Sequence, residues 1–302
     1  MENNHHYRYD QHKHRKRIPV LIAVACCCIG ILFACLKFGA FYLGKSVEAS
    51  ASKGEVLSEE SSETPSEEAG ADDFSPGNIS WEKDENGVHL DVPYLDQDDL
   101  LPSGCELVSS LMLLEYYHYS YTVDDIIDNL DMGNLSEIDD PNYDYAGPSP
   151  EECFVGNPLN GDGFGCFPPV IQKMMNRILK GGQQAVDTSG ESLDDLAKQY
   201  LDQGKPVLVW TTILWGTAYP SDTWLLTKPG VYSIPEEDVS SSLITNQTYT
   251  WPANEHCVVF VGYDEDNFYF NDPYADSGTV AYSKEQANQC YETMGYRSLA
   301  VE

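Results

Sequence analysis

Basic residues are scarce in this chain of 302 residues. Lys and Arg together number 17 against 49 Asp and Glu, and residues 46–302 hold ten basic against 47 acidic side chains. A surface of this charge repels the phosphate backbone of DNA and RNA, so we expect no nucleic acid as a partner. No internal repeat is present either, so the sequence does not predict a repeat architecture.

Sets of metal ligands are lacking as well. The acidic residues of the segment 139–152 do not have the spacing of an EF-hand, and no His/Cys set accompanies them. These residues are Asp139, Asp140, Asp144, Glu151 and Glu152. We expect a solvated acidic loop there, with no metal ion and no cofactor.

Long apolar runs are confined to the N-terminus. Residues 18–36 carry no charge and are about long enough for the roughly 30 Å hydrocarbon core of a membrane. The basic stretch HKHRKR precedes them and places that end in the cytoplasm. We expect a cytoplasmic basic segment over 1–17, a transmembrane anchor over 18–44, and everything after it outside the cell.

Two other interpretations of the N-terminus stay open. Cleavage by a signal peptidase near residues 49–51 would release a secreted protein, and a lipoprotein site at Cys35 is a weaker alternative. Residues 45–80 are rich in Ser and Glu and hold little that could form a core, which is typical of a disordered acidic linker. Residues 81–302 are long enough for one substantial domain.

Apolar periodicity within 81–302 predicts both helices and strands, and therefore an α+β fold. The segment 133–169 is rich in Gly, Pro and Asn and predicts a long loop. The predicted helices cover 103–117, 122–130, 170–180 and 192–204, and the predicted strands cover 88–95, 206–214 and two stretches of a hairpin within 256–274.

A cysteine stands at the start of the first predicted helix. Ser103 and Glu106 match the capping box, which places Cys105 at the second helical position. Unpaired N–H groups and the helix dipole favour a thiolate there, so we expect a lowered pKa and a nucleophilic sulfur. Taken alone, Cys105 fits a small buried apolar residue equally well.

A base and an acid follow far downstream. His256 begins the first strand of the hairpin and Asp272 ends the second. The order Cys, His, Asp supplies a nucleophile, a base that takes its proton, and a carboxylate that holds the imidazole. Strand parity allows His256 and Asp272 to meet only if the turn between them is odd or a bulge interrupts the pairing.

Three stretches carry a family resemblance: VPYLDQDDLLPSGCELVSSLMLLEYYHYSYTVDDI, CFVGNPLNGDGFGCFPPVI and HCVVFVGYDEDNFYFNDPY. Together they resemble the C39-like cysteine peptidases, which are relatives of the double-glycine leader peptidases of bacteriocin export. The resemblance implies a papain-like fold, in which an N-terminal helix carrying the nucleophile packs on an antiparallel sheet. It also implies roles for Cys105 as nucleophile, His256 as base, Asp272 as orienting acid and Gln97 as oxyanion donor.

Five cysteines follow the apolar N-terminal segment: Cys105, Cys153, Cys166, Cys257 and Cys290. If Cys105 stays unpaired, the other four allow three sets of two bridges. A Cys153–Cys166 bridge across the base of the predicted loop is the preferred one. Cys257 adjoins His256 on a strand and points to the opposite face, so we do not expect it to be the nucleophile.

The sequence thus predicts a monomeric, membrane-anchored cysteine peptidase that acts on peptides or proteins outside the cytoplasm. A transglutaminase-like acyl transferase and a non-catalytic cell-surface binding module are the alternatives. The joint presence of Gln97, Cys105, His256 and Asp272 argues against a domain that has lost catalysis.

Overall fold

The computed structural model describes residues 81–98, 100–235, 242–274 and 278–302. The predicted basic segment, transmembrane anchor and linker of residues 1–80 lie outside these ranges. Within the described part of the chain, no helix combines the length and the apolar character that crossing a membrane requires.

Antiparallel pairing builds the main sheet. Its strands are neighbours in the order β1-β2-β11-β8-β14-β7, and β12 and β13 extend it from β11. The central strands β8 and β11 are buried along almost their whole length, as their apolar sequences require. The strands are β1 (Trp81–Lys83), β2 (Val88–Leu90), β7 (Ala185–Asp187), β8 (Val207–Thr212), β11 (Glu255–Tyr263), β12 (Asn267–Asn271), β13 (Thr279–Ser283) and β14 (Ser298–Val301).

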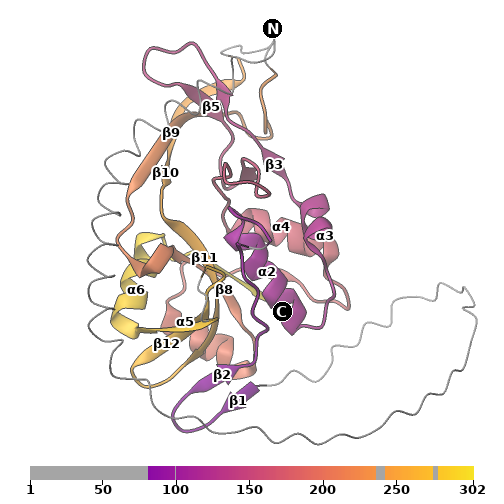
Figure 1. The fold of residues 1–302 in the computed structure, drawn as a ribbon, viewed down its shortest axis with the longest axis vertical. Coiled ribbons are helices and arrows are strands. Elements are labelled where there is room, and N and C mark those ends of the chain that lie inside the picture. Colours follow the sequence, from indigo (N-terminus) through magenta and orange to yellow (C-terminus); the bar gives the residue numbers. More distant parts are fainter. Residues whose placement is uncertain (1–80, 99, 236–241, 275–277) are drawn as a thin grey trace, which may run out of the picture. The chain divides into compact units, whose positions relative to one another are not determined.

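Helices cover both faces of this sheet (Figure 1). On one side α2 packs against β11 and β8 and is joined by α3 and α4, while α6 packs against β8, β12 and β13. Every residue of α2 except Glu115 is buried, so α2 is the central helix of the domain. The helices are α2 (Cys105–Tyr116), α3 (Val123–Asn129), α4 (Pro168–Ile178), α5 (Leu193–Gln199) and α6 (Lys284–Thr293), with 3-10 helices η1 (Leu201–Gln203) and η2 (Ile213–Trp215).

A second sheet lies beyond the first, with strand order β10-β9-β5-β4. Its strand β10 continues into β11 with two residues between them, and Figure 1 shows β9 and β10 as a long pair that leads away from the main sheet. The strands outside the main sheet are β3 (Met132–Gly133), β4 (Ser136–Glu137), β5 (Tyr145–Gly147), β6 (Phe154–Val155), β9 (Pro220–Thr227) and β10 (Ile244–Pro252). The prediction of one long loop over 133–169 is therefore wrong, because strands of two or three residues are too short to show a period in the sequence.

The other predicted elements are present with shifted ends. The helix predicted over 170–180 begins at Pro168, because proline fits the first turn, where no N–H bond is needed. The helix predicted over 192–204 is α5 followed by η1, and Gly204, at a φ of 72°, ends it as expected. The strand predicted over 88–95 ends at Leu90, shortly before Pro93, which cannot donate to a sheet.

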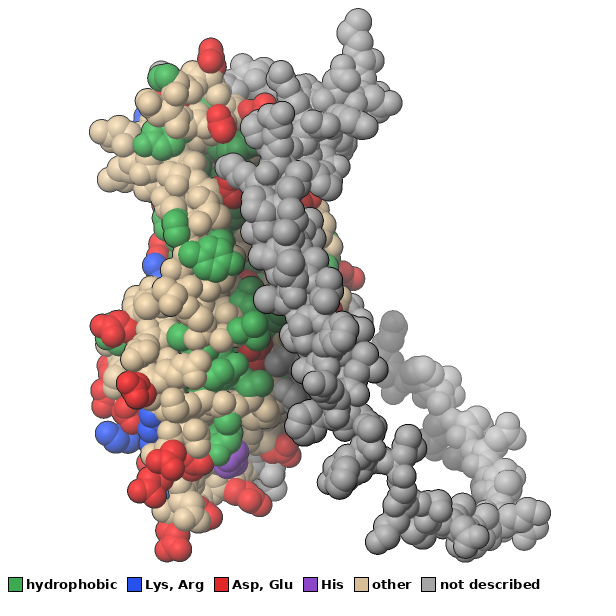
Figure 2. Space-filling model, turned by 60° about the vertical axis from the view of Figure 1, so that its left-hand side comes forward, with side chains coloured by type: hydrophobic (Ala, Val, Ile, Leu, Met, Phe, Trp, Pro, Cys, Tyr) green, Lys and Arg blue, Asp and Glu red, His purple; other side chains and the backbone are tan. Residues whose placement is uncertain are grey.

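The observed mixture of helices and a largely antiparallel sheet confirms the predicted α+β class. The surface also agrees with the composition. On the face shown in Figure 2, acidic side chains clearly outnumber basic ones.

Candidate active site

Cys105 is the first residue of α2, and Gly104 precedes it without a side-chain cap. Both members of the predicted capping box have other partners. Ser103 Oγ donates to the backbone oxygen of Asn160, and Glu106 turns inward, where its Oε1 accepts the N–H of Cys166 at 2.7 Å. The predicted capping box is therefore wrong, because contacts from a distant segment outweigh the local pattern, and Cys105 takes the first helical position rather than the second.

The thiol of Cys105 is buried beside carboxyl groups. The residue is 7 % exposed, and its Sγ donates to Oε2 of Glu106 at 3.4 Å. Burial, followed by the charges of Glu106 and Glu255, raises the pKa of Cys105 well above its usual value. The predicted lowering of this pKa is wrong, because the loss of water outweighs the partial charges at the helix start.

His256 and Asp272 are in direct contact. His256 Nε2 lies 2.6 Å from Asp272 Oδ1, and both residues are buried. Burial acts to raise the pKa of Asp272, but the hydrogen bond and charge of His256, together with the Tyr274 N–H, hold it below its usual value. An ionised Asp272 accepts the Nε2–H, which leaves Nδ1 of His256 free to take up a proton.

A β-bulge brings these two side chains to one face of the sheet. Four residues lie between the paired residues Tyr263 and Phe268, and an even number would by itself place Asp272 on the face away from His256. The register then shifts at Val261, an extra residue on β11 without a partner on β12. The shift returns Asp272 to the face of His256, so the prediction of an odd turn or a bulge is confirmed in the form of a bulge.

Gln97 connects the segments that carry Cys105 and Asp272. Its backbone N–H donates to Pro273, the residue after Asp272, at 2.9 Å. Its Nε2 donates to the backbone oxygen of Pro102, three residues before Cys105, at 3.1 Å. The side chain is buried, and its Oε1 has no hydrogen-bond partner among the described residues.

Of the four predicted residues, the structure brings His256 and Asp272 into contact and places Gln97 against the segments next to Cys105 and Asp272. Between Cys105 and His256 the described residues show no hydrogen bond, because the thiol is directed to Glu106 instead. Their roles in catalysis remain predictions.

Sequence reasoning did not place Glu106 and Glu255 beside Cys105. Glu255 begins β11 next to His256, and ligand-type atoms of Cys105, Glu106 and Glu255 all lie within 4.8 Å of one another. Burial raises the pKa of Glu106 to about 7, and burial followed by the charge of Glu106 raises the pKa of Glu255 well above its usual value. In the sequence, Glu106 and Glu255 each lie at the border of an apolar run, where burial is expected, and this pattern could have indicated their position.

A strained loop adjoins His256. Leu214 and Trp215 have φ angles of 55° and 53°, which are unusual for residues other than glycine. Asn254 holds this loop, because its backbone oxygen accepts the N–H of Ile213 at 2.9 Å and its Nδ2 donates to a loop carbonyl at 3.1 Å. The side chain of Leu214 is 74 % exposed. Backbone strain beside a candidate base is typical of a segment that contacts a ligand.

The cysteines of the described residues are all free thiols. The predicted Cys153–Cys166 bridge is therefore wrong. Backbone hydrogen bonds join the two ends of the segment 153–166 instead. The Val155 N–H donates to the backbone oxygen of Gly165 at 2.9 Å. Because that pairing already fixes the two ends, the segment does not need a covalent link there.

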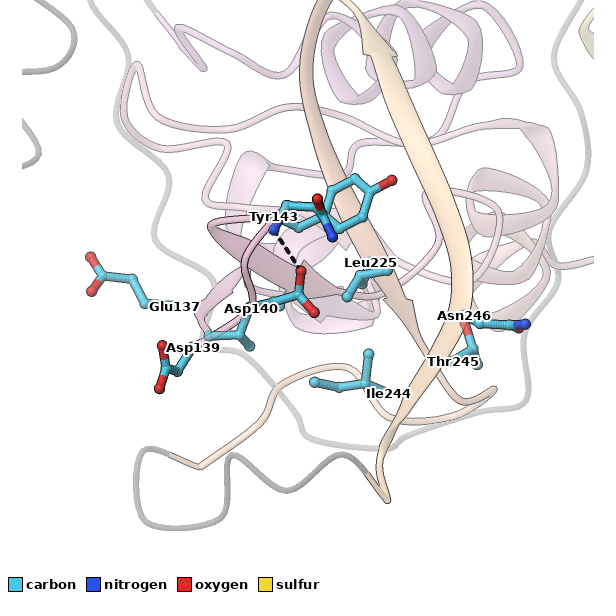
Figure 3. A pocket seen from close by; sticks show the side chains of 10 residues that line it. Glu137, Asp139, Asp140, Tyr143, Leu225, Ile244, Thr245 and Asn246 are labelled. Atoms are coloured by element: carbon cyan, nitrogen blue, oxygen red, sulfur yellow. Dashed lines mark hydrogen bonds between the residues drawn. The ribbon is translucent and has the colours of Figure 1, made fainter.

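A cavity of about 710 Å³ lies at the second sheet, away from the predicted site residues. It is formed by β4, the following acidic segment, β9 and β10, and Figure 3 shows Glu137 and Asp139 pointing outward from it. Asp140 accepts the backbone N–H of Asn142 at 2.9 Å. Asp139 is thus exposed and Asp140 is bound to backbone, whereas Glu151, predicted as part of the same solvated loop, pairs with Arg297.

A central helix that begins with a cysteine, packed on an antiparallel sheet that carries a His–Asp pair, is the arrangement expected of the cysteine peptidases that the sequence resembles. Residues 89–299 match the model of the Peptidase_C39 like family, and the chain belongs to this family. The chain is also similar in fold to the crystal structure of a proposed C39-like peptidase from Bacillus anthracis. That comparison gives a TM-score of 0.56 and 24% sequence identity, and covers 70% of this chain and 94% of the other. No curated protein matches the chain.

Proposed function

We propose that this chain is a cysteine peptidase that cleaves peptide bonds outside the cytoplasm. Cys105 is the nucleophile, His256 the base, Asp272 the acid that orients it, and Gln97 the oxyanion donor. The observation that carries the proposal is the buried contact of 2.6 Å between His256 and Asp272, in a member of the C39-like family whose central helix begins with Cys105.

The proposed reaction begins when the Cys105 thiol turns from Glu106 toward His256, whose Nδ1 takes its proton. The sulfur then attacks the peptide carbonyl carbon, and the oxyanion that forms accepts a hydrogen bond from the Gln97 amide. As the C–N bond breaks, a thioester forms and His256 returns the proton to the leaving amine. Water next attacks the thioester with His256 as base, which releases the acid product and the free thiol.

The raised pKa of Cys105 is compatible with this order of events. The thiol is neutral while it is buried beside two carboxyl groups. A thiolate forms only after the sulfur has moved to the imidazole, since an adjacent imidazolium stabilises the negative charge. Cys105 is thus a neutral thiol in the resting enzyme and a thiolate only when it contacts His256.

The papain-like arrangement of the domain is part of the proposal, and the central helix on an antiparallel sheet supports it. The cell-surface location rests on the sequence of residues 1–44 alone. In this proposal the chain is a monomer held by its N-terminal segment, or secreted after cleavage, and its substrate is a peptide or a protein.

Covalent trapping tests the proposed function. The 302-residue chain is incubated with a peptidyl reagent that alkylates thiols, and the adduct is mapped by mass spectrometry. We expect the adduct on Cys105, its loss in Cys105→Ala and strong slowing in His256→Ala, because the imidazole generates the thiolate. Cys290→Ser is the matched control, since Cys290 is also a buried thiol, and it should leave the labelling unchanged. An adduct on another cysteine, or equal labelling in His256→Ala, would contradict the proposal.

A further inference from the structure

Cys105, Glu106 and Glu255 form a cluster that the proposed hydrolysis does not use as a unit. All three residues are buried, and one ligand-type atom from each lies within 4.8 Å of the other two. We propose that this thiol–carboxyl cluster is a binding site for Zn²⁺. Cys105 Sγ and one carboxylate oxygen each from Glu106 and Glu255 are the ligands, and water takes the fourth position.

The spacing of Cys105 and Glu106 fits this ion. With Zn–S and Zn–O distances of about 2.3 and 2.0 Å, neighbouring sulfur and oxygen ligands of a tetrahedral zinc ion lie about 3.5 Å apart. Cys105 Sγ and Glu106 Oε2 are already 3.4 Å apart. The second oxygen of Glu106 accepts the N–H of Cys166 at 2.7 Å, which orients the carboxylate and leaves Oε2 toward the metal position, as outer hydrogen bonds do in metal sites.

An unpartnered atom points independently to a missing ligand. Glu255 is 7 % exposed, and its Oε1 has no hydrogen-bond partner among the described residues. A buried carboxyl group without a partner is costly, and a second carboxyl group beside it adds repulsion. A divalent cation between the two groups removes both penalties.

The neighbouring cation is engaged elsewhere. Arg297 donates to Glu151 Oε1 at 2.5 Å, and its guanidinium lies over the ring of Phe167 at 3.6 Å. Its charge lowers the pKa of Glu255 only as the weakest of the three influences on that group, after burial and Glu106. No side chain of the described residues forms an ion pair with Glu106 or Glu255.

The donor set selects the metal. Mg²⁺ and Ca²⁺ bind through oxygen alone, whereas Zn²⁺ accepts a thiolate together with carboxylates. A zinc ion on Cys105 also occupies the lone pair that would attack a substrate, so the metal is a reversible inhibitor. This consequence rests on the proposed function, but the binding itself does not.

Cobalt titration tests the site directly. The 302-residue chain, freed of metal by a chelator, is titrated with Co²⁺, and absorbance is recorded. We expect a thiolate-to-cobalt charge-transfer band that saturates at one equivalent and disappears when Zn²⁺ is added. Cys105→Ser should abolish the band, and Glu255→Gln should weaken Co²⁺ binding at least about tenfold. Cys290→Ser and Glu285→Gln make the same chemical changes elsewhere and should leave the affinity unchanged.

The same titration has outcomes that overturn the proposal. Absence of the band in the wild-type chain means that the two carboxyl groups hold a shared proton instead of a metal. An unchanged affinity in Glu255→Gln means that the thiol binds cobalt without the cluster. Peptide hydrolysis by the metal-free chain distinguishes the two proposals, because a chain that forms the band with cobalt but cleaves no peptide when free of metal retains the metal site and refutes the peptidase.

Discussion

At the scale of single residues, the Cys105 thiol has a carboxylate as its hydrogen-bond partner. In the metal-free chain, iodoacetamide should therefore alkylate Cys105 slowly at neutral pH. Burial raises the pKa of Glu106 to about 7, so above pH 7 this side chain is charged in the wild-type chain. Glu106→Gln removes that charge and should therefore speed the alkylation above pH 7. The charge of Glu106 raises the pKa of Cys105, so its removal increases the thiolate fraction.

Peptide mapping of the alkylated chain at several times measures this rate. Glu285→Gln, which removes an exposed carboxylate on α6, is the control and should leave the rate as it is. An equal rate in Glu106→Gln and the wild-type chain would mean that Glu106 does not influence the nucleophile.

Asp272 is predicted to act through the orientation of His256. Asp272→Asn preserves the shape of the side chain but can donate to Nε2, which favours the wrong tautomer of the imidazole. We expect kcat for peptide hydrolysis to fall at least about a hundredfold, with little change in the melting temperature. Asp266→Asn is the matched control, because Asp266 is exposed in the turn of the same hairpin. A kcat unchanged by Asp272→Asn would remove Asp272 from the mechanism.

Gln97 is predicted to contact the substrate oxygen mainly in the transition state. Gln97→Ala should lower kcat on the order of a hundredfold or more and leave KM nearly unchanged, because such a contact strengthens as charge develops. Gln172→Ala provides a comparison, since Gln172 Nε2 also donates to a backbone oxygen, that of Ala185, at 3.2 Å. If Gln97→Ala raised KM alone, Gln97 would be a substrate-binding residue.

At the scale of secondary-structure elements, the bulge at Val261 sets the face on which Asp272 lies. Deletion of Val261 should restore regular pairing of β11 with β12 and turn Asp272 away from His256. We expect peptide hydrolysis to be lost in this variant, while circular dichroism still reports a folded sheet. Val261→Ala keeps the bulge and should retain kcat, at a cost of roughly 1–2 kcal/mol in the free energy of unfolding. A deletion variant that retains kcat would mean that the His256–Asp272 contact does not depend on the bulge.

The elements next to the site were predictable because their patterns are long. The apolar run after Cys105, the buried strand after Lys205 and the final hairpin each show a clear period or a continuous apolar stretch. The strands β9 and β10 were missed, since much of their surface is exposed or half-buried and their residues are polar. The short strands of 133–169 pair mostly with one another, β3 with β6 and β4 with β5, and only β5 pairs with a distant strand, β9.

The candidate site was predictable in its residue types but not in its electrostatics. Once His256 and Asp272 were taken as partners, strand parity predicted an odd turn or a bulge between them, and the structure has the bulge. The inward turn of Glu106 was not predictable, because the capping pattern with Ser103 describes local energies only. The N–H group of Cys166, sixty residues further along the chain, competes with that pattern and determines where the carboxylate lies.

At the scale of the whole molecule, the chain is strongly acidic, with a net charge of -32 and a pI of about 4.2. Five of the 17 basic residues lie within residues 1–17, the segment predicted to face the cytoplasm, whereas residues 46–302 hold ten basic against 47 acidic side chains. This separation of charge matches a chain with one end at an anionic membrane surface and an acidic domain outside it. The location is therefore testable by access from outside the cell.

A protease added to intact cells should release a fragment that begins within residues 45–80 and contains Cys105. The reason is that the composition of 45–80 predicts a segment without a core, which is cut far faster than the packed domain that follows. Mass spectrometry of the released fragment gives its first residue, and the thiol-directed trap reports whether Cys105 still reacts.

Permeabilised cells are the control for access. Protection of the whole domain in intact cells, with cleavage only after permeabilisation, would place it inside the cytoplasm and refute the proposed location. A fragment beginning near residue 51 that is present in the medium before any protease is added identifies signal-peptide cleavage instead of an anchor.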